Sequence, residues 1–485
     1  MKRFQARQLQ PTPVWLGRLS IELRRLASPL LSGHLKGLFS ITFDIPLEPL
    51  PAPSASARDW FYWRRPDEGS VLLGLGRALS VGARGTGRFP SLGREWERLQ
   101  EGWTHLNQGS ANPWARAFLG FAFDAGSDNR GDWSGFPNSV LVVPRLLLEW
   151  RNGHCMLTFT HLRGQGERPE QVIAQWLSAL KDAMEEERDE SDPAACRLHA
   201  RKEMPEPERW RQGVAEAVEA IGSGKMTKVV LAREVQLAFG QVVDHRRLLG
   251  RLGLDYPGCT LFAVRFDGAT LVGATPERLL SIRQGAVTSD ALAGTLEAKQ
   301  AWNTEAMIRH EHRPVVDAIL SALAPHCSGL EAGQSPASLR LQKLSHFYTR
   351  VQGRLKPGSD LFQLIEALHP TPAVGGLPRQ AALDWIRERE GIERGWYTGA
   401  VGWLGGAGDA ELSVVLRCGL IQGKQARLYA GAGITEVSDP AAELGETRMA
   451  PGAERIVLES EKPFTEISQH FAKLLKVISR IQQAF

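Results

Sequence analysis

The sequence predicts an α+β protein with large mixed or antiparallel sheets flanked by helices, and two observations predict it. Apolar residues make up 43% of the 485 residues, which is enough for a large core. Segments rich in β-branched and apolar residues are numerous, but they do not alternate with helices in the regular order of a parallel sheet. Strands that pair mainly with antiparallel neighbours fit this pattern best.

The first part of the chain predicts a hairpin, a helix and a linker, in that order. Two apolar runs, residues 139–150 and 155–160, flank an Asn-Gly turn, which is a common hairpin signal. Residues 170–187 carry apolar side chains at helical spacing. Residues 186–209 are polar and contain three prolines, so we expect them to form a linker.

The second part mixes helical and strand patterns, and most of the residues suited to chemistry lie in it. We therefore expect the functional site there. Helices are expected over residues 210–223, 303–323 and 381–389. Strands are expected over residues 228–237, 260–266, 271–273 and 412–421.

Composition and charge exclude several classes of partner. The formal net charge is only +4, with 58 basic and 54 acidic residues spread along the chain, so no nucleic-acid partner is expected. The five cysteines are far apart and odd in number, which indicates a reducing compartment. No apolar stretch is long enough to span a membrane, so no membrane partner is expected. We expect a cytoplasmic, soluble protein.

Lys228 opens the segment Lys-Val-Val-Leu-Ala-Arg, which predicts a strand. Side chains alternate along a strand, so Lys228 shares a face with Val230 and Ala232. A lysine among apolar strand residues lies either at a solvated edge or in a pocket. The solvated edge is the more frequent case, because lysines are seldom buried without a partner.

Glu277 follows a short predicted strand in the segment Gly-Ala-Thr-Pro-Glu-Arg. Pro276 restricts the backbone to a turn, which would present Glu277 from a strand end into a cleft. Thr-Pro-Glu is also a common helix start, in which Glu277 would serve as a capping acid. The residues alone favour the cap and leave the cleft open.

Glu311 lies on the apolar stripe of its predicted helix. It stands three residues after Ile308 and four before Val315, and both belong to that stripe. A carboxylate on a buried helix face needs a partner, and a divalent cation is one of the few adequate ones. His310 and His312 flank it on different helix faces, so a zinc site is not expected and packing roles are.

The C-terminal segment places glycines ahead of a predicted helix that carries two acids. Gly431 belongs to Gly-Ala-Gly, and such glycines let a ligand approach the backbone closely. Asp439 and Pro440 are typical of an N-cap and a first helical turn. Glu443 and Glu446 share one helix face, which suits an oxygen-ligated Mg²⁺ and equally suits solvated charge near a helix start.

The order of these segments is far more specific than any one of them. Residues 210–447 resemble the chorismate-utilising enzymes, namely the isochorismate, salicylate, anthranilate and aminodeoxychorismate synthases. The matching segments are, in order, KVVLARE, GATPERLL, DALAGT, RHEHRPVVDAI, LQKLSH, LHPTPAVGGLP, GWYTGAVGW, VVLRCGLI and AGAGITEVSDPAAELGET. The resemblance implies large sheets around a central chorismate cleft. It divides the chain into a variable first part of the same fold over residues 1–200, a catalytic domain over 205–457 and a tail over 458–485.

The resemblance also implies roles for the residues singled out above. Lys228 corresponds to the general base that activates water, and Glu277 to the general acid that protonates the departing ring hydroxyl. Glu311 and Glu446 correspond to direct Mg²⁺ ligands, and Glu443 to an acid that acts near the metal through water. Mg²⁺ is therefore the expected cofactor and chorismate the expected substrate.

Six further positions correspond to substrate-binding residues of the family. The fork of an arginine pairs well with a carboxylate, which suits Arg417 to the pyruvyl group of chorismate. The resemblance assigns the pyruvyl carboxylate to Tyr397, Arg417 and the backbone at Gly431. It assigns the surroundings of the substrate ring to Gly294, Thr295 and His346.

Within the family, two positions favour water as the nucleophile. Anthranilate synthases usually carry glutamine where Lys228 stands, and aminodeoxychorismate synthases usually carry a lysine where Ala293 stands. Neither an ammonia-dependent reaction nor an amidotransferase subunit is therefore expected. We expect isochorismate as the product, for menaquinone or siderophore synthesis. Salicylate, formed by a further loss of pyruvate, is the alternative.

Two positions depart from the family pattern. Ala450 stands where the family usually has a lysine that helps to bind the substrate carboxylate, and Ile308 where it usually has an acid near the metal. Arg448 and Arg455 are candidates to replace that lysine. A weakly active chorismate-binding homologue is accordingly the second alternative.

Overall fold

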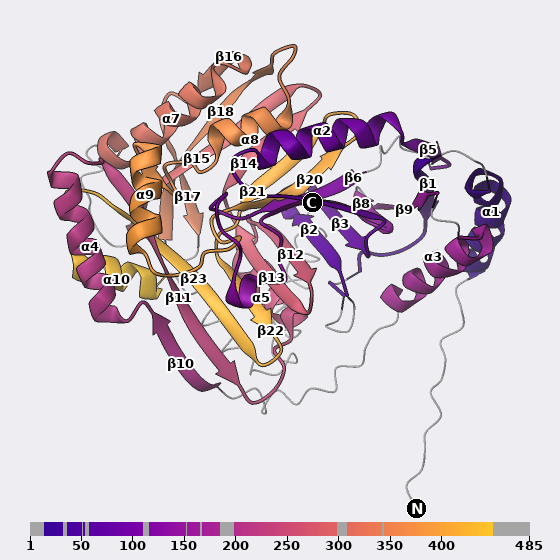
Figure 1. The fold of residues 1–485 in the computed structure, drawn as a ribbon, viewed down its shortest axis with the longest axis horizontal. Coiled ribbons are helices and arrows are strands. Elements are labelled where there is room, and N and C mark those ends of the chain that lie inside the picture. Colours follow the sequence, from indigo (N-terminus) through magenta and orange to yellow (C-terminus); the bar gives the residue numbers. More distant parts are fainter. Residues whose placement is uncertain are drawn as a thin grey trace, which may run out of the picture.

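The computed structural model has the α+β fold that the sequence predicts (Figure 1). Its described residues contain a 13-stranded and a 10-stranded sheet with helices around them. Across these residues, no helix combines the length and apolar character that crossing a membrane requires. The described residues are 14–32, 36–50, 52–53, 58–109, 116–151, 153–164, 167–184, 198–297, 308–341 and 344–449.

The 13-stranded sheet is antiparallel except where its last two strands pair. It contains strands from both parts of the chain, and they meet where β12 pairs with β2. In sheet order the strands are β10 (Leu198–Met204), β11 (Lys228–Phe239), β23 (Gln425–Ile434), β22 (Cys418–Gln422), β13 (Ala269–Thr275), β12 (Thr260–Phe266), β2 (Trp60–Arg65), β3 (Ser70–Leu75), β8 (Leu146–Arg151), β9 (His154–Arg163), β1 (Gly37–Ile45) and β5 (Thr104–Asn107), and β19 (Gly376–Leu377) pairs with β11.

The 10-stranded sheet is antiparallel throughout its described pairs and also joins both parts of the chain, where β20 pairs with β6. In sheet order its strands are β16 (Cys327–Ala332), β18 (Leu344–Leu355), β15 (Ala286–Glu297), β14 (Arg278–Arg283), β21 (Ala410–Val414), β20 (Ala400–Gly405), β6 (Arg116–Phe121), β7 (Ser139–Val143) and β4 (Leu79–Ala83), and β17 (Ala337–Leu341) pairs with β18.

The helices lie around the sheets, and three of them surround the start of β11 (Figure 1). Helix α10 contacts α4, and both α4 and α9 contact β11. The described helices are α1 (Val14–Leu31), α2 (Arg88–Glu101), α3 (Pro169–Met184), α4 (Pro207–Gly222), α5 (His245–Asp255), α7 (Arg313–Leu323), α8 (Leu361–Leu368), α9 (Arg379–Arg389) and α10 (Pro440–Met449).

Aromatic side chains from both sheets form one shared core between them. Phe61 of β2 stacks on Phe118 of β6, with ring centroids 4.8 Å apart. Phe266 of β12 packs edge-on against Trp396 at 6.0 Å. Gly120 of β6 makes room for the indole of Trp396, because a Cβ at that position would lie 2.0 Å from the ring. This close packing holds the two sheets in a defined relation.

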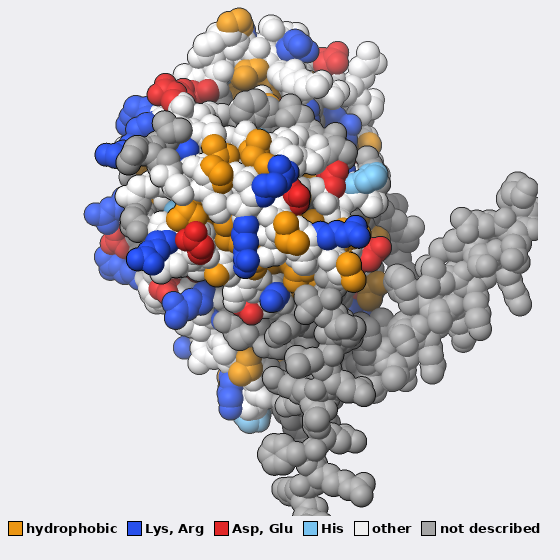
Figure 2. Space-filling view, turned by 90° about the vertical axis from the view of Figure 1, so that its right-hand side faces the viewer, with side chains coloured by type: hydrophobic (Ala, Val, Ile, Leu, Met, Phe, Trp, Pro, Cys, Tyr) orange, Lys and Arg blue, Asp and Glu red, His pale blue; other side chains and the backbone are white. Residues whose placement is uncertain are grey.

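Charged side chains of both signs are mixed on the face that Figure 2 shows, with apolar side chains scattered between them. Elsewhere on the surface, acidic and basic residues also pair within one helix, as Arg98 does with Glu95 of α2 at 2.7 Å. The mixture agrees with the small net charge of +4.

Most of the expected elements are confirmed. The helices expected over residues 170–187, 210–223 and 381–389 are α3, α4 and α9, and the strand expected over residues 228–237 is β11. The helix expected over residues 303–323 is confirmed as α7 from residue 313 onward. It is preceded by a π-helical turn, Ile308–His312, and residues 298–307 lie outside the described part of the chain.

The expected linker over residues 186–209 is wrong in its second half. Leu198–Met204 forms β10, an edge strand that pairs with β11. Its charged residues suggested a linker, but charged side chains are also common on edge strands, where they face water. Residues 185–197 lie outside the described part of the chain.

Two expected strands are each divided between the two sheets. Residues 412–421 fall in β21 of one sheet and β22 of the other, because Arg417 between them has a φ of +46°, which a continuous strand does not allow. The apolar run over residues 139–150 divides at Pro144 into β7 and β8, since proline cannot donate a ladder hydrogen bond. The expected hairpin that follows is confirmed as β8 and β9.

Candidate active site

Two of the places where the chain crosses between the sheets are adjacent, and each of these two crossings carries a predicted site residue. Glu277 lies in the link from β13 to β14, and Arg417 lies in the link from β21 to β22. Because β13 pairs with β22 and β14 pairs with β21, the two links are neighbours. The Val414 N–H donates a hydrogen bond of 3.0 Å to the carbonyl oxygen of Glu277.

Lys228 is the first residue of β11 and only 8% of it is exposed, so the expectation of a solvated edge lysine is wrong. Its neighbour across the sheet is β23, where Gly433 lacks the side chain that would crowd it. A Cβ on Gly433 would lie 3.0 Å from the Cε of Lys228 and 3.4 Å from its Nζ. Burial lowers the pKa of Lys228, and the negative charges of Glu311, Glu277 and Glu443 act in the opposite direction.

Glu277 is 3% exposed and lies between two strands, so its expected role as a helix cap is wrong. Its own backbone N–H donates to the Thr275 hydroxyl at 3.2 Å, which fixes the turn. Burial raises the pKa of Glu277 to about 8, and the nearby carboxylate of Asp290 adds to the rise. Lys228 and Arg417 oppose it. Glu277 is therefore held in its protonated form at neutral pH.

Asp290 of β15 is a second buried acid beside Glu277, and the sequence argument missed it. It is 6% exposed, and the Tyr348 hydroxyl donates to its Oδ1 at 3.0 Å. Burial raises its pKa, while Arg278 and the bond from Tyr348 lower it. A carboxylate directly before the apolar run Ala-Leu-Ala was the signal that could have identified it, because a buried carboxylate needs a specific partner.

Two acidic residues of two helical segments, Glu311 and Glu443, act on Lys228, and Glu446 in turn acts on Glu443. Glu311 lies in the π-helical turn Ile308–His312, and such turns are frequent at functional sites. Glu443 and Glu446 lie on α10, whose N-terminus is capped as expected, since the Ala442 N–H donates to Asp439 at 2.8 Å. Burial raises the pKa of Glu443 to about 7, and the negative charges of Glu446 and Glu311 add to the rise. A hydrogen bond from Ser438 acts in the opposite direction.

These crowded carboxylates suit a divalent cation by their chemistry. Hard oxygen ligands are those that Mg²⁺ prefers, and a cation would relieve the mutual repulsion that raises the pKa of Glu443. In the described stretches, no three His, Cys, Asp or Glu side chains stand together as a preformed metal-ligand group. Oxygen ligands from the substrate and from water would have to complete the coordination.

His312 beside Glu311 packs into the core and is not placed as a ligand. It is 2% exposed, and its Nε2 shares a hydrogen bond of 2.7 Å with the Thr349 hydroxyl. Burial lowers its pKa, so it is neutral at physiological pH. The side chain of His310 lies outside the described part of the structure.

Arg417 presents an open donor toward the site. Its Nη2 donates to His346 Nε2 at 3.0 Å, and its guanidinium lies 5.5 Å from the centre of the Tyr256 ring. Its Nη1 is buried without a hydrogen-bond partner in the described structure. Buried donors are almost always satisfied, so this one is suited to a ligand oxygen. The hydrogen bond from Arg417 Nη2 to His346 Nε2 also means that this Nε2 carries no proton, because an arginine can only donate.

Tyr397 and Gly431 meet on the face of β23 that also carries Gly433, which lies next to the Lys228 side chain. Tyr397 is 3% exposed, stacks on Tyr429 at 5.1 Å, and has its pKa raised by burial. A Cβ on Gly431 would lie 2.9 Å from the Tyr397 hydroxyl. The bare glycine therefore leaves room at that hydroxyl. Gly431 pairs with Ala232 of β11, which links this region to the strand of Lys228.

The remaining expected residues are placed by their backbones. Gly294 and Thr295 lie at an irregularity of β15, and Thr295 pairs with His346 of β18. The side chain of Thr295 lies outside the described part, as do Ala450 and Arg455 and the side chain of Arg448. No described ion pair joins Lys228 to Glu277, although each influences the pKa of the other.

The site thus combines a buried lysine, a buried protonated acid, a group of carboxylates and an arginine with a free donor. A lysine with a lowered pKa can accept a proton and an acid with a raised pKa can donate one. The arginine suits a carboxylate and the acidic group suits a cation. Together these groups can carry out acid–base chemistry on a small anionic molecule.

Comparison with known proteins agrees with this geometry. Residues 32–450 match the model of a family described as "Chorismate binding enzyme". The salicylate biosynthesis isochorismate synthase of Pseudomonas aeruginosa is 33% identical over 442 residues, which cover 87% of this chain and 90% of that protein. Isochorismate synthase MenF of Bacillus subtilis is 31% identical over 408 residues, which cover 80% of this chain and 85% of that protein. The solved structure of MenF, the menaquinone-specific isochorismate synthase from Escherichia coli, is similar with a TM-score of 0.73, 25% identity, and coverage of 91% of this chain and 99% of that one.

Proposed function

The chain belongs to the chorismate-binding enzyme family, and from that premise we propose that it is an isochorismate synthase, an isomerase that converts chorismate to isochorismate with Mg²⁺. One observation of the site supports this most strongly. Lys228 and Glu277 are buried in one site with pKa values shifted toward each other, downward for the lysine and upward to about 8 for the acid. A displacement by water needs such a pair, with a neutral base and a protonated acid.

The proposed reaction is a displacement with allylic rearrangement. Neutral Lys228 takes a proton from water as its oxygen bonds to C2 of chorismate. The ring double bonds shift, the C4–oxygen bond breaks, and protonated Glu277 gives its proton to the departing hydroxyl, which leaves as water. One water enters and one leaves, so the product is an isomer of the substrate. Lys228 ends charged and Glu277 ionised, and solvent exchange resets both.

We assign the cation to Glu311 and Glu446, with Glu443 acting beside it through water. A bound Mg²⁺ supplies positive charge for the ring carboxylate of chorismate. The raised pKa of Glu443, to which the charges of Glu446, Glu311 and Asp439 contribute, supports a cation there. The protein's own residues keep these oxygen ligands near Lys228, since Glu311 and Glu443 both influence its pKa.

We assign the pyruvyl carboxylate to Arg417, Tyr397 and the backbone at Gly431. The unpartnered Nη1 of Arg417 supports its part in this assignment, and the open space at the Tyr397 hydroxyl supports the other two. Gly294, Thr295 and His346 are assigned to the surroundings of the ring. His346 serves in addition as a neutral acceptor that orients Arg417.

The proposal includes no nucleic-acid partner, no amidotransferase subunit and a location in the cytoplasm. It also keeps residues 1–200 as a variable first part, 205–457 as the catalytic domain and 458–485 as a tail. The names of similar proteins differ in the product's use: the Pseudomonas aeruginosa enzyme is named for salicylate biosynthesis, the Escherichia coli MenF is menaquinone-specific and the Vibrio cholerae enzyme is vibriobactin-specific. The proposed use of the product is menaquinone synthesis or siderophore and salicylate synthesis.

The purified protein, incubated with chorismate and Mg²⁺ and analysed by liquid chromatography, tests the proposal. Isochorismate without added ammonia or a second subunit is the expected product. Salicylate with an equal amount of pyruvate would replace the proposal with a salicylate synthase. An amino product that depends on ammonia would contradict both. Traces of product at saturating substrate would indicate the weakly active homologue.

A further inference from the structure

Along residues 230–233, one edge of β11 has no neighbouring strand among the described residues. β19 pairs with Lys228 and Val229, and β10 pairs with β11 only from Glu234 onward. Val230 and Ala232 lie in the gap between β19 and β10. Their outward backbone groups need other partners, because buried N–H and C=O groups are rarely left unbonded.

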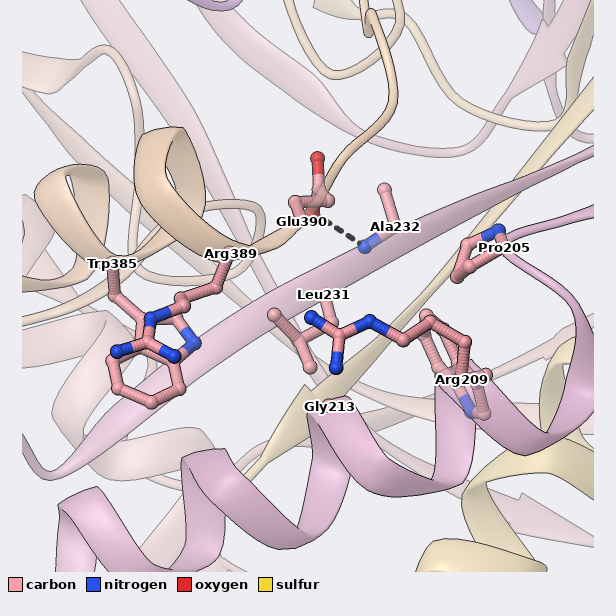
Figure 3. A pocket seen from close by; sticks show the side chains of 9 residues that line it. Pro205, Arg209, Gly213, Leu231, Ala232, Trp385, Arg389 and Glu390 are labelled. Atoms are coloured by element: carbon pink, nitrogen blue, oxygen red, sulfur yellow. Dashed lines mark hydrogen bonds between the residues drawn. The ribbon is translucent and has the colours of Figure 1, made fainter.

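Two charged side chains supply those partners. The Ala232 N–H donates to Glu390 Oε2 at 2.7 Å, as the dashed line in Figure 3 shows. Arg394 Nη2 donates to the Val230 carbonyl oxygen at 2.7 Å, and the Val230 N–H donates to the Gly375 carbonyl at 2.9 Å. Glu390 and Arg394 thus take the place of a strand along the stretch that follows Lys228.

The same two side chains form a buried ion pair that reaches the loop of Tyr397. Their side chains are 3% and 4% exposed, and Arg394 Nε donates to Glu390 Oε1 at 2.6 Å. Arg394 Nη1 donates to the Val374 carbonyl at 3.0 Å and to the Thr398 hydroxyl at 3.2 Å. The Thr398 hydroxyl donates in turn to the Tyr397 carbonyl at 2.6 Å. Arg394 therefore bonds both the strand of Lys228 and the loop of Tyr397.

On its solvent side, the contact between Glu390 and Ala232 borders a shallow hollow between α4 and α9 (Figure 3). Trp385 and Arg389 of α9 line it on one side and Arg209 of α4 on the other, while Leu231 and Glu390 form its floor. Glu390 therefore lies between the strand edge and the solvent. Here a side chain, and not a further strand, closes the edge of the sheet.

We propose that Glu390 and Arg394 are positioning residues, one buried ion pair that holds the strand of Lys228 and the loop of Tyr397 in a defined relation. Neither residue is assigned to the substrate. The inference rests on the proposed function for the importance of Lys228 and Tyr397, but the contacts themselves do not depend on it. A buried ion pair loses hydration, and apolar residues of similar volume are often as stable, so stability alone explains this pair poorly.

The test removes both charges together, so that neither is left buried without its partner. The variant Glu390→Met/Arg394→Met fills similar volume but cannot bond Val230, Ala232 or Thr398. The matched control is Glu388→Gln/Arg389→Lys, which changes an adjacent, exposed acid and base of the same region. Three quantities are measured on the full chain: kcat and KM for chorismate, the melting temperature, and hydrogen–deuterium exchange of peptides covering residues 228–234 and 395–400.

The Met/Met variant is expected to fold and to lose about 10- to 100-fold in kcat, because a displacement of about 1 Å at a reacting group can have an effect of that size. Amides in residues 228–234 should exchange faster, while the control keeps wild-type values. Near-wild-type kcat would overturn the inference, and so would a loss of kcat with unchanged exchange in both peptides. If the Met/Met variant does not fold, the same measurements are made on Arg394→Lys. One ammonium cannot reach Val230, Val374 and Thr398 together, so this variant should show the same loss of kcat and the same faster exchange.

The exchange measurement is made without substrate and so separates this inference from the proposed function. If the wild-type protein makes no isochorismate, the proposed function fails. The positioning role is then decided by exchange alone, and unchanged protection in the variant would overturn it.

Discussion

Gly433 of β23 faces the side chain of Lys228, and a Cβ at that glycine would lie 3.4 Å from the lysine Nζ and 3.0 Å from its Cε. The two residues lie far apart in the sequence and meet because β11 and β23 pair, with Val230 opposite Gly433. Because Gly433 has no Cβ, it leaves part of the space that the buried amine of Lys228 occupies. The buried position in turn lowers the pKa of Lys228, because burial disfavours the charged form.

Gly433→Ala is therefore expected to displace the Lys228 amine while the fold persists. The lysine tip is flexible and can yield by a few tenths of an ångström. We expect kcat to fall about tenfold, since catalytic groups tolerate little displacement. Gly213→Ala in α4 is the control, because a Cβ there meets no atom within 4 Å. Equal kcat values for the two variants, measured by isochorismate formation, would show that Gly433 does not shape the site.

The pH profile should show an alkaline limb set by Glu277. Its pKa is raised to about 8, so its protonated fraction, and with it kcat/KM, is expected to fall as the pH rises through about 8. Asp290, Lys228 and Arg417 are the charged neighbours that influence it. Removing the Asp290 charge removes a cause of the rise, so Asp290→Asn should move this limb to lower pH. The exposed Asp384→Asn is the control. A limb that stays in place in Asp290→Asn would mean that Asp290 does not tune the acid.

Metal removal should abolish turnover reversibly. Excess chelator is expected to stop isochorismate formation and added Mg²⁺ to restore it, because the carboxylates of Glu311 and Glu446 are assigned to that ion. Glu311→Gln and Glu446→Gln should each need more Mg²⁺ for half-maximal rate, by about tenfold or more. Glu436→Gln, outside the proposed ligand set, should keep the wild-type requirement. Full activity in excess chelator would show that the reaction does not require Mg²⁺.

The sequence predicted the elements that carry the site better than it predicted their surroundings. Alternation along residues 228–237 placed Lys228 on a strand, and β11 confirms it. Its burial could not be foreseen from that segment, because Gly433 and the acidic neighbours come from distant parts of the chain. Order along the sequence, rather than any local pattern, was what suggested the proposed site residues as a set.

Crossings between sheets account for most of what local patterns could not predict. Residues 412–421 read as one strand, yet the positive φ of Arg417 sends the chain from one sheet to the other. The same architecture brings Asp290 of β15 close to Glu277. Local hydrophobic patterns describe which face of a strand is buried, but they do not say which sheet it joins. The approach of Glu390 and Arg394 to the edge of β11 is non-local for the same reason.

The most direct test of the account is the kcat of Lys228→Ala beside that of Lys225→Ala, measured as isochorismate formed with saturating chorismate and Mg²⁺. Lys225 is exposed and three residues earlier in the chain, which makes it a matched control. General base assistance contributes about 100- to 10,000-fold, so Lys228→Ala should lose about that much in kcat, with KM little changed because Arg417 and Tyr397 remain. Lys225→Ala should keep wild-type kcat. Near-wild-type kcat in Lys228→Ala would contradict the proposed activation of water by this residue.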